Sequence, residues 1–522
     1  MNSSSSTRSR IWPIVYAAVT ILTCAVYLFA ARREFGIGFP LDDAWIHQTY
    51  ARNLVDLKTW AFQPGPTSGG STSPLWTMIL VPGAALRIDP RAWAFLVGGA
   101  ALFLTALFSR EWLGRRLSDQ TWAWMAGIVV LLEWHLAWAG LSGMETILEA
   151  LLIVLVFLQL ESPQTNPIVV GSLIGLGVWI RPDALTLLLP IAWLLAWDPA
   201  PVGDRVLRLG LTGVGLAMLV LPYLAFNRLV GGEWWPTTFY AKQAEYAILR
   251  QTSLTGRLLG EFVQPMIGVG IMLLPGLGLG TWRGIRERKW GRLAPLVWAL
   301  GFMSIYALRL PVTYQHGRYI IPTIPIVLVV GLEGLISSGR PSLRPSRRRW
   351  TSLAWPASAG GVLVGFWLLG AGAYARDVSI IESEMVAASG WIANHTEPGA
   401  IIAAHDIGAL GYFGGRSVLD LAGLVSPDVI PILRDESSLA QYLDRNGADY
   451  LMTFPGWYPE LTRGAQPIFK TAAPYSPAAG GENMVVYRWE AVEFASKGPT
   501  MLYSPHSNGG RLEHGDDTGH HR

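Results

Sequence analysis

The sequence is poor in cysteine and in charged residues. Cys24 is the only cysteine in 522 residues, which excludes an internal disulfide and a metal site built from several cysteines. Charged residues make up 15% of the chain, compared with about 25% in a soluble domain. The net charge of +3 is small, and no basic arm interleaved with aromatic residues is present. We therefore expect no nucleic-acid partner.

Apolar segments take the place of the missing charge. Hydrophobic residues account for 51% of the chain, which also contains 24 tryptophans. A membrane-spanning helix needs about 20 mainly apolar residues, and eleven segments approach that length. They are 11–31, 91–109, 121–139, 145–160, 167–180, 183–198, 209–226, 263–281, 293–309, 318–336 and 353–374. The run 74–86 is only about 13 residues long, which favours an interfacial or re-entrant helix over a span.

The basic residues predict which loops face the cytoplasm. No small-residue cleavage site follows the first segment, so we expect a retained anchor with a cytoplasmic N-terminus. With eleven spans, every dense basic cluster falls in a cytoplasmic loop, as the positive-inside rule requires. These clusters contain Arg110, Arg115, Arg116, Arg205, Arg208, Arg283, Arg286, Arg288, Lys289, Arg292, Arg340, Arg344, Arg347, Arg348 and Arg349. The sequence thus predicts a mainly α, polytopic protein of the cell membrane, whose other polar loops face outward.

The chain changes character after residue 374. Residues 375–495 combine strand-like stretches such as GAIIAAH with helical stretches at 379–394 and 437–446, and predict a small extracytoplasmic α/β domain. Within it, DIGALGYFGGR (406–416) predicts turns. Residues 496–522 lack periodicity and large aliphatic clusters, so we expect a disordered tail. Residues 1–374 form the predicted transmembrane domain, with a first outer loop at 32–90.

Several outer motifs resemble one family. The run DDAWIHQTYARNL, WAFQPG and STSPLW in the first outer loop is similar to that loop in GT-C glycosyltransferases, including terminal arabinofuranosyltransferases of the mycobacterial type. SGMET, RPD, PTTFYAK and HGRYIIP follow in the family's order, and HDIGALGYFGGRSVLDLAGLVSP resembles its C-terminal segment. Thr49, Gly69 and Thr237 depart from the family's pattern. These departures bear on the sugar and the acceptor more than on the class of reaction.

The resemblance implies transfer of a monosaccharide from a polyprenyl-phosphate donor to an extracytoplasmic glycan, lipid or protein acceptor, with inversion. Such a reaction needs a base for the acceptor hydroxyl and cations for the leaving phosphate. By analogy Asp42 is the expected base and Asp43 orients sugar or acceptor. Adjacent carboxylates near a low dielectric oppose double ionisation, so that the pKa of one rises. The alternative is that the pair caps the helix beginning near Ala44.

The remaining predicted site residues are candidates for substrate contact. Lys242, Arg318, His316 and Arg181 could hold the phosphate, because Arg binds it in bidentate fashion and Lys as a point charge. The alternative is anchoring at span ends, and for Arg181 pairing with Asp183. His316 could instead be a second base or a hydrogen-bonding wall. His47, Glu145 and Tyr240 are expected to contact sugar, with a hydrogen-bonded wall, a helix-dipole role and an aromatic belt as their respective alternatives. These residues come from the sequence.

Two further possibilities stay open at this point. His47 follows Asp43 by four residues, so the two could share a helix face and a divalent metal, although we favour no metal and expect no certain cofactor. A transporter or flippase for a polyprenyl-linked sugar would place ionisable residues within spans, and Glu133 with His135 is the main sign of that kind. A non-catalytic sugar-binding protein is the other alternative. His405 and Asp406, at a strand end before glycines, favour a structural turn.

Overall fold

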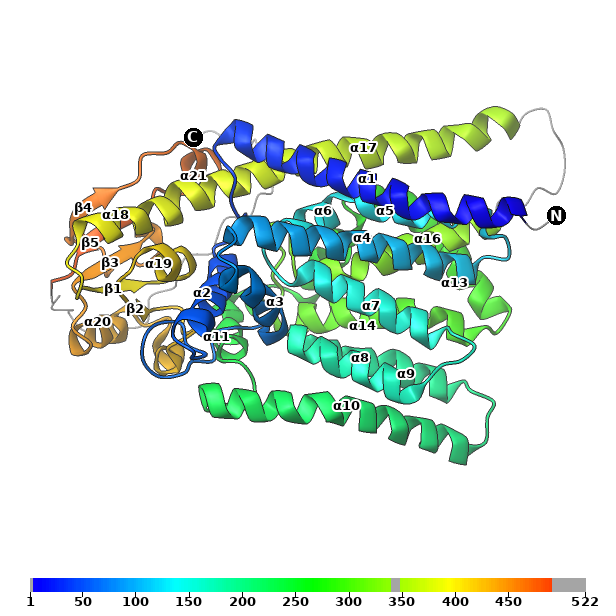
Figure 1. Cartoon of the computed structure of the whole chain (residues 1–522), viewed down its shortest axis with the longest axis horizontal. Coiled ribbons are helices and arrows are strands. Elements are labelled where there is room, and N and C mark those ends of the chain that lie inside the picture. Colours follow the sequence, from blue (N-terminus) through cyan, green and yellow to red (C-terminus); the bar gives the residue numbers. More distant parts are fainter. Residues whose placement is uncertain (1–2, 339–347, 491–522) are drawn as a thin grey trace, which may run out of the picture.

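The computed structural model describes residues 3–338 and 348–490. Long helices lie along the length of the molecule, and a small sheet domain sits at one end (Figure 1). Six helical segments are long and apolar enough to cross a membrane. They are Ile11–Glu34, Pro90–Arg116, Val202–Gly231, Trp290–Arg309, Tyr314–Ser338 and Ala354–His395. The corresponding elements are α1 (Ser3–Glu34), α4 (Pro90–Arg116), α10 (Val202–Gly231), α14 (Ala294–Arg309), α16 (Ile324–Ser338) and α17 (Arg348–Ile381).

Two bent helix pairs bring the number of such segments to as many as eight. One pair joins α5 (Trp124–Leu132) to α6 (Trp134–Gly140), and the other joins α12 (Leu254–Val263) to α13 (Val269–Arg286). The bends are 61° and 102°. Three shorter apolar helical segments occupy the other predicted spans: α7 (Thr146–Leu160), α8 (Pro167–Ile180) and the run Pro182–Ala196, which includes α9 (Leu188–Ala196). The polytopic, mainly α fold is confirmed, and each of the eleven predicted segments contains apolar helix.

The bend between α5 and α6 explains the acidic residue inside this span. Glu133 has extended backbone angles, and its carboxylate accepts a hydrogen bond of 2.9 Å from the backbone N–H of Leu136, in the first turn of α6. Its other oxygen lies 2.8 Å from His135 Nδ1. A buried carboxylate is tolerated where it is paired and satisfies helix-end donors. Glu133 and His135 therefore support a break in the helix.

The short segment at 74–86 forms α3 (Pro74–Ala85), which packs on the amphipathic helix α2 (Asp43–Asp56). Both lie where the helices meet the sheet domain (Figure 1). Trp45 on α2 is fully buried, and its ring packs at an angle against the rings of Tyr412 and Phe413 from that domain, with centroids 4.9 and 4.6 Å apart. Large aromatic surfaces buried in this way hold the first outer loop against the domain.

The α/β domain has a five-stranded sheet in the order β2-β1-β3-β5-β4. Its strands are β1 (Ile401–Ala404), β2 (Ser417–Asp420), β3 (Tyr450–Thr453), β4 (Gln466–Lys470) and β5 (Val485–Arg488), and its helices include α18 (Ala387–His395), α19 (Gly408–Phe413) and α20 (Glu436–Arg445). The strands β1, β2 and β3 are parallel, and β5 runs antiparallel to both its neighbours. The segment predicted as turns contains helix α19, which corrects that expectation. The sequence reading also missed β4, an edge strand containing Pro467.

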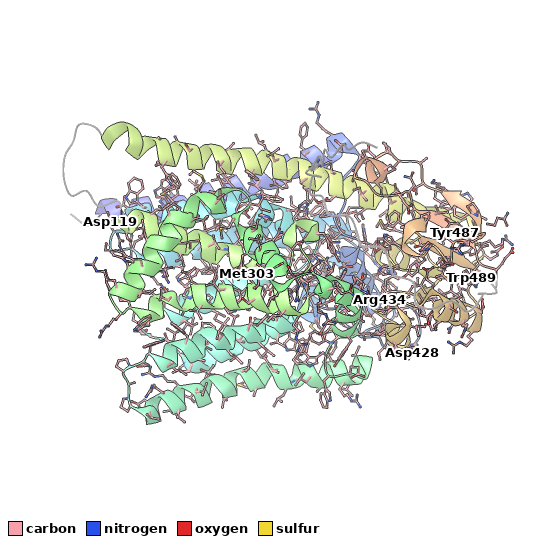
Figure 2. All side chains as sticks on the ribbon, turned by 180° about the vertical axis from the view of Figure 1, so that it is seen from behind. Asp119, Met303, Asp428, Arg434, Tyr487 and Trp489 are labelled. Carbon is pink, nitrogen blue, oxygen red and sulfur yellow. The ribbon has the colours of Figure 1, made fainter. Side chains whose placement is uncertain are left out.

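A π-helical turn, Glu382–Val386, connects α17 to α18 without a break in the helical path. The turn places Glu384 inward, where its carboxylate accepts hydrogen bonds from the backbone N–H of Met484 at 2.7 Å and from Asn483 Nδ2 at 2.9 Å. The last spanning helix therefore carries the sheet domain directly. We call this end of the helices the domain end and the opposite one, where Asp119 is labelled in Figure 2, the far end. The predicted tail at 496–522 lies outside the described residues.

Candidate active site

Asp42 joins the first outer loop to the α/β domain. It precedes α2, yet its side chain makes no cap on that helix. Its carboxylate instead accepts hydrogen bonds from the backbone N–H groups of Gly408 at 2.6 Å and Ala409 at 2.8 Å, at the start of α19. Burial raises the pKa of Asp42 to about 6, although these two N–H donors oppose the rise. Both oxygens of this carboxylate are thus already engaged.

Asp43 meets two cations from distant parts of the chain. Its Oδ2 accepts hydrogen bonds from Arg318 Nη2 at 2.8 Å and from Lys242 Nζ at 3.3 Å. Lys242 comes from α11 (Thr237–Glu245), and Arg318 lies in the turn before α16. Burial opposes ionisation of Asp43, but the Lys242 and Arg318 charges hold its pKa well below the usual range. The predicted acidic pair and two of the predicted cations therefore lie together.

Arg318 has donors to spare. It is 5% exposed, and neither its Nε nor its Nη1 has a hydrogen-bond partner among the described residues. Buried polar groups are almost always hydrogen-bonded, so an exception points to a missing ligand or water. The Arg318 guanidinium can therefore donate hydrogen bonds to an anionic group while it keeps its bond to Asp43.

Arg181 has a different environment, because three carboxylates surround it. Asp183 lies 3.0 Å away, Glu149 3.2 Å and Glu145 3.4 Å. Glu145 also approaches His47 Nε2 at 3.7 Å, and the Nδ1 of that histidine is 2.9 Å from the Thr77 hydroxyl. The charge of Arg181 is thus already balanced, and His47 forms part of a hydrogen-bonded wall.

Three cavities meet at these residues. The apolar cavity, of about 400 Å³, has apolar side chains such as Phe239 and Ile305 in its lining. Its charged lining residues are Arg181, Lys242, Arg309, Arg318, Glu145 and Asp183. Phe239 and Ile305 are 40% and 43% exposed, so this cavity lies beside an outer apolar surface of the helices. The bridging cavity, of about 220 Å³, shares Lys242 and Arg318 with it and adds Asp43, Glu245, His405 and Asp406.

The acidic cavity is the largest of the three, at about 510 Å³. It lies between the helices and the α/β domain, and Asp43 and Asp406 line both it and the bridging cavity. Five carboxylates and no Lys or Arg line it: Asp42, Asp43, Asp377, Asp406 and Glu482. Trp138 and Trp457 add aromatic surface. Such a lining suits a polyhydroxylic ligand that can stack and donate hydrogen bonds.

His316 and Tyr240 lie away from the Asp43 cluster. His316 Nε2 is 2.7 Å from Asp377 Oδ2, and its ring packs between Trp134 and Trp138 at 5.2 and 5.3 Å. His316 does not line the acidic cavity itself but contacts Asp377, which does. Asp377 was not among the site residues identified from the sequence. Tyr240 lines none of these three cavities and packs edge-on against Phe239.

His405 and Asp406 also belong to this site, at the carboxyl end of strand β1. Carboxyl ends of parallel strands are the usual ligand side of such sheets. Although burial lowers it, Glu245 raises the pKa of His405 to about 9. Burial, with the charge of Asp42, raises the pKa of Asp406 to about 8, and its Oδ2 has no partner among the described residues. The signal in the sequence that could have placed both residues in the site is their position at the end of a strand, directly before a glycine-containing segment. In the described part of the chain, no three His, Cys, Asp or Glu side chains are grouped to hold a metal ion.

Solved structures share this architecture. ArnT from Cupriavidus metallidurans, bound to undecaprenyl phosphate, matches with a TM-score of 0.59 and 14% identity over 91% of this chain and 97% of that one. The Archaeoglobus fulgidus oligosaccharyltransferase tethered to an acceptor peptide matches with 0.58 and 12% over 92% and 74%. The same organism's AglB, in complex with an inhibitory peptide and a dolichol-phosphate, matches with 0.55 and 12% over 86% and 70%.

These matches establish the fold: the chain is a multi-pass membrane protein with the GT-C fold, as the first outer loop predicted. Within that fold, residues 374–495 match a domain of unknown function, DUF8728. No curated protein matches the sequence.

Proposed function

We propose that this chain is an integral membrane glycosyltransferase that moves a monosaccharide from a polyprenyl-phosphate donor to an acceptor on the domain end, outside the membrane. The observation that carries the proposal is the position of Lys242 and Arg318. Both line the apolar cavity and the bridging cavity, and both bond to Asp43. Two cations thus lie between a cavity with apolar surface and the carboxylate of Asp43.

The apolar cavity is the proposed donor site. Its lining provides apolar surface for a prenyl chain, while Lys242 and the free donors of Arg318 are available for the phosphate. Arg181 and Arg309 also line this cavity. The three carboxylates next to Arg181 already balance its charge, so we expect it to contribute less to phosphate binding. The likeness to ArnT with undecaprenyl phosphate and to AglB with a dolichol-phosphate supports a lipid phosphate as the ligand.

The acidic cavity is the proposed acceptor site. It reaches Asp43 from the side of the α/β domain and carries carboxylates and tryptophans without Lys or Arg. Neutral sugar hydroxyls can donate to such carboxylates and stack on Trp457, whereas an anionic acceptor would be repelled. The acceptor class that fits is therefore a neutral glycan or glycolipid.

The geometry favours Asp43 over Asp42 as the general base. Both residues line the acidic cavity, but both Asp42 oxygens accept backbone N–H groups, whereas Asp43 also lines the bridging cavity and holds both cations through one oxygen. Bound donor phosphate would share Lys242 and Arg318 and add a negative charge nearby, which raises the pKa of Asp43. The base therefore becomes effective when the donor is present, and Asp42 positions α2 against α19.

The reaction then proceeds as a displacement with inversion. The acceptor hydroxyl oxygen forms a bond to the anomeric carbon, and the bond from that carbon to the phosphate oxygen breaks. The electron pair of that bond goes to the lipid phosphate, beside Lys242 and Arg318, and the hydroxyl proton goes to Asp43. General-base assistance of this kind contributes about 10²–10⁴ in rate.

The test is release of undecaprenyl phosphate from a panel of undecaprenyl-phosphate monosaccharides, with the full chain in nanodiscs and neutral oligosaccharides as acceptors. We expect release that depends on an acceptor and disappears in Asp43→Asn, while that variant still binds undecaprenyl phosphate. Asp42→Asn should lose activity together with contact between α2 and α19, measured as proteolysis of the α/β domain. Unchanged release in Asp43→Asn rules out this base.

Transport of the sugar-lipid without chemistry is the competing function. Its main support in the sequence, Glu133 with His135, is occupied at the bend between α5 and α6. Movement of labelled undecaprenyl-phosphate sugar across liposomes with no glycosidic product would favour the transporter. Tight binding with neither product nor movement would favour a sugar-binding protein.

A further inference from the structure

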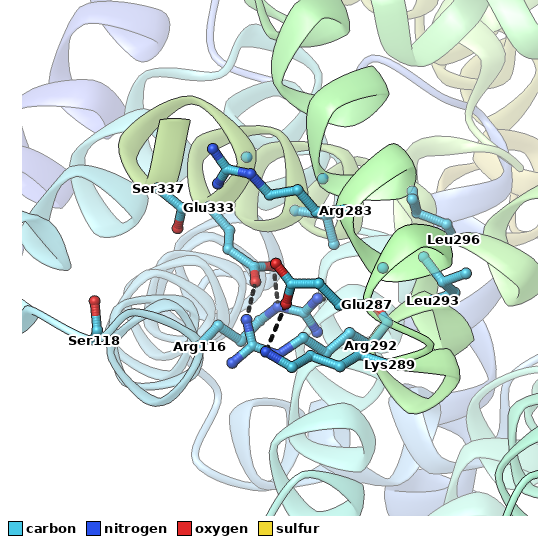
Figure 3. Close-up of a pocket in the computed structure, with 14 residues that line it drawn as sticks. Arg116, Ser118, Arg283, Glu287, Lys289, Arg292, Leu293, Leu296, Glu333 and Ser337 are labelled. Atoms are coloured by element: carbon cyan, nitrogen blue, oxygen red, sulfur yellow. Dashed lines mark hydrogen bonds and ion pairs between the residues drawn. The ribbon is translucent and has the colours of Figure 1, made fainter. Parts of the chain in front are cut away.

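A second charged cavity lies at the far end of the helices, away from the site described above. It has a volume of about 320 Å³ and is formed by the ends of α4, α13 and α16 and by residues 289–293. Its polar lining comprises Arg116, Arg283, Lys289, Arg292, Glu287, Glu333, Ser118 and Ser337 (Figure 3). Leu293, Leu296 and Val330 provide its apolar floor.

The core of this cavity is a buried ion network. Arg116, which is 4% exposed, bonds to Glu333 and Glu161 and donates to the backbone oxygen of Arg292 at 3.0 Å. Arg292 Nη1 donates to the other oxygen of Glu333 at 2.8 Å. At the rim, Lys289 pairs with Glu287 at 2.7 Å. Each of these cations has a carboxylate partner.

Arg283 is the exception. Its side chain has no ion pair or hydrogen bond with any residue that the structure describes, and Figure 3 shows it beside the cavity without a dashed line. It is only partly exposed. Among the described residues, four cations therefore face the cavity region with three carboxylates, counting Glu161. Arg283 interacts with Glu287 only at longer range, so its guanidinium keeps all of its hydrogen-bond donors for a ligand.

The surface next to Arg283 is apolar. On α13, Leu279, Trp282 and Ile285 are 39%, 53% and 50% exposed, and α13 is one of the apolar segments of the bundle. Arg286 lies over the Trp282 ring at 5.0 Å. Exposed Trp beside Arg at the end of an apolar helix is typical of the boundary between hydrocarbon and headgroups. A phosphate held by Arg283 would have its acyl chains along this surface.

We propose that the far-end cavity binds a phosphate group, carried by the headgroup of an anionic phospholipid. Arg283 provides the guanidinium without a hydrogen-bond partner and Lys289 a second, exchangeable donor. The charge-paired Arg116–Glu333–Arg292 network holds the wall of the cavity in place. Basic pockets between spanning helices bind acidic headgroups in this way. The site is independent of glycosyl transfer, so its failure would leave the proposed function untouched.

The experiment measures thermal unfolding and bound lipid, by native mass spectrometry, for the full chain in a neutral detergent. Dioleoylphosphatidylglycerol is compared with dioleoylphosphatidylcholine and with inorganic phosphate. The variant is Arg283→Gln, and the matched control is Arg286→Gln, which removes the same charge from the same helix but does not line the cavity.

We expect phosphatidylglycerol to raise the unfolding temperature by several degrees and phosphatidylcholine to have little effect. Arg283→Gln should weaken phosphatidylglycerol binding about tenfold, as expected for one charge-assisted contact, while Arg286→Gln changes it less than twofold. If inorganic phosphate raises the unfolding temperature as much as phosphatidylglycerol does, and Arg283→Gln removes this effect, the phosphate site is kept and the lipid is overturned as the source of the phosphate. Equal losses in both variants, or no phosphatidylglycerol effect in wild type, would overturn the site itself.

Discussion

The two ends of this molecule contain buried arginines in contrasting states. At the far end, Arg116 uses its Nε and both terminal nitrogens, and both oxygens of Glu333 are engaged. At the domain end, two nitrogens of Arg318 have no hydrogen-bond partner among the described residues. The Oδ2 atom of Asp406 has none either. A closed network ties helices together, whereas an open one retains bonding capacity for a ligand. Substitutions at the two ends should therefore affect different properties.

Replacing the central carboxylate at the domain end should give the largest effect. We expect Asp43→Asn to lower the turnover number per folded molecule by about 10²–10⁴, because it removes the proposed base. Asp56→Asn, on the same helix and paired with Arg87 on the surface, is the matched control and should retain activity. Turnover of undecaprenyl-phosphate sugar per folded molecule is the measurement; similar losses in both variants would refute a specific role for Asp43.

The corresponding change at the far end should affect stability instead. Glu333→Gln leaves the buried Arg116 charge with one carboxylate fewer, and breaking a buried pair in this way costs about 3–5 kcal/mol. Chemical unfolding in mixed micelles would measure the loss, and turnover per folded molecule should stay within about twofold. A folded, stable Glu333→Gln protein that has lost turnover would contradict the division between the two ends.

Weakening the cationic side of the proposed donor site should have an intermediate effect. Lys242→Gln is expected to raise the Kd for undecaprenyl phosphate about tenfold, since one charge-assisted contact is lost. Arg250→Gln, on the adjoining segment Tyr246–Gln251 and outside the three cavities, serves as the control. Binding can be followed by tryptophan fluorescence. A Kd that does not change in Lys242→Gln would move the phosphate away from this residue.

The smallest expected effect is a pH dependence at the domain end. The raised pKa of Asp406, about 8, means that the folded state keeps a proton that the unfolded chain loses near pH 4. Stability from this group is full below about pH 4 and falls as pH rises to about 8, by at most about 1.4 kcal/mol per pH unit. His405, with a pKa of about 9, adds a fall in the same direction above about pH 6.5.

Asp406→Asn should therefore remove about half of the fall in unfolding temperature between pH 6 and 8, leaving the part due to His405. The control is Asp444→Asn in α20, whose carboxylate bonds to Trp489 away from the cavities. Differential scanning fluorimetry over this pH range is sufficient. A slope identical to wild type in Asp406→Asn would mean that Asp406 is ionised in the folded protein.

The sequence allowed the apolar helices to be predicted because each one is an apolar run, a pattern that a single stretch of chain reveals. It did not predict that some of them are short or bent, which leaves, among the described residues, six to eight segments long enough to cross a membrane instead of eleven. The first outer loop likewise contains its acidic pair within one motif. Contacts across the chain were harder to predict: Asp42 bonds to α19, 366 residues further on, and Asp377 meets His316 across two helices. Nothing in the local spacing of His405 and Asp406 separates a turn from a ligand-side strand end, because the distinction depends on what packs opposite them.

The continuous path from α17 through the π-helical turn to α18 has a mechanical consequence. Its residue Tyr374 donates to the backbone oxygens of Gly38 and Leu141, and Glu384 fixes the start of β5. The α/β domain cannot rotate away from the helix bundle unless this continuous helical connection unwinds. For the proposed acceptor site this means an entrance of nearly constant shape, so that the width of the acceptor's chain end would decide which glycan enters.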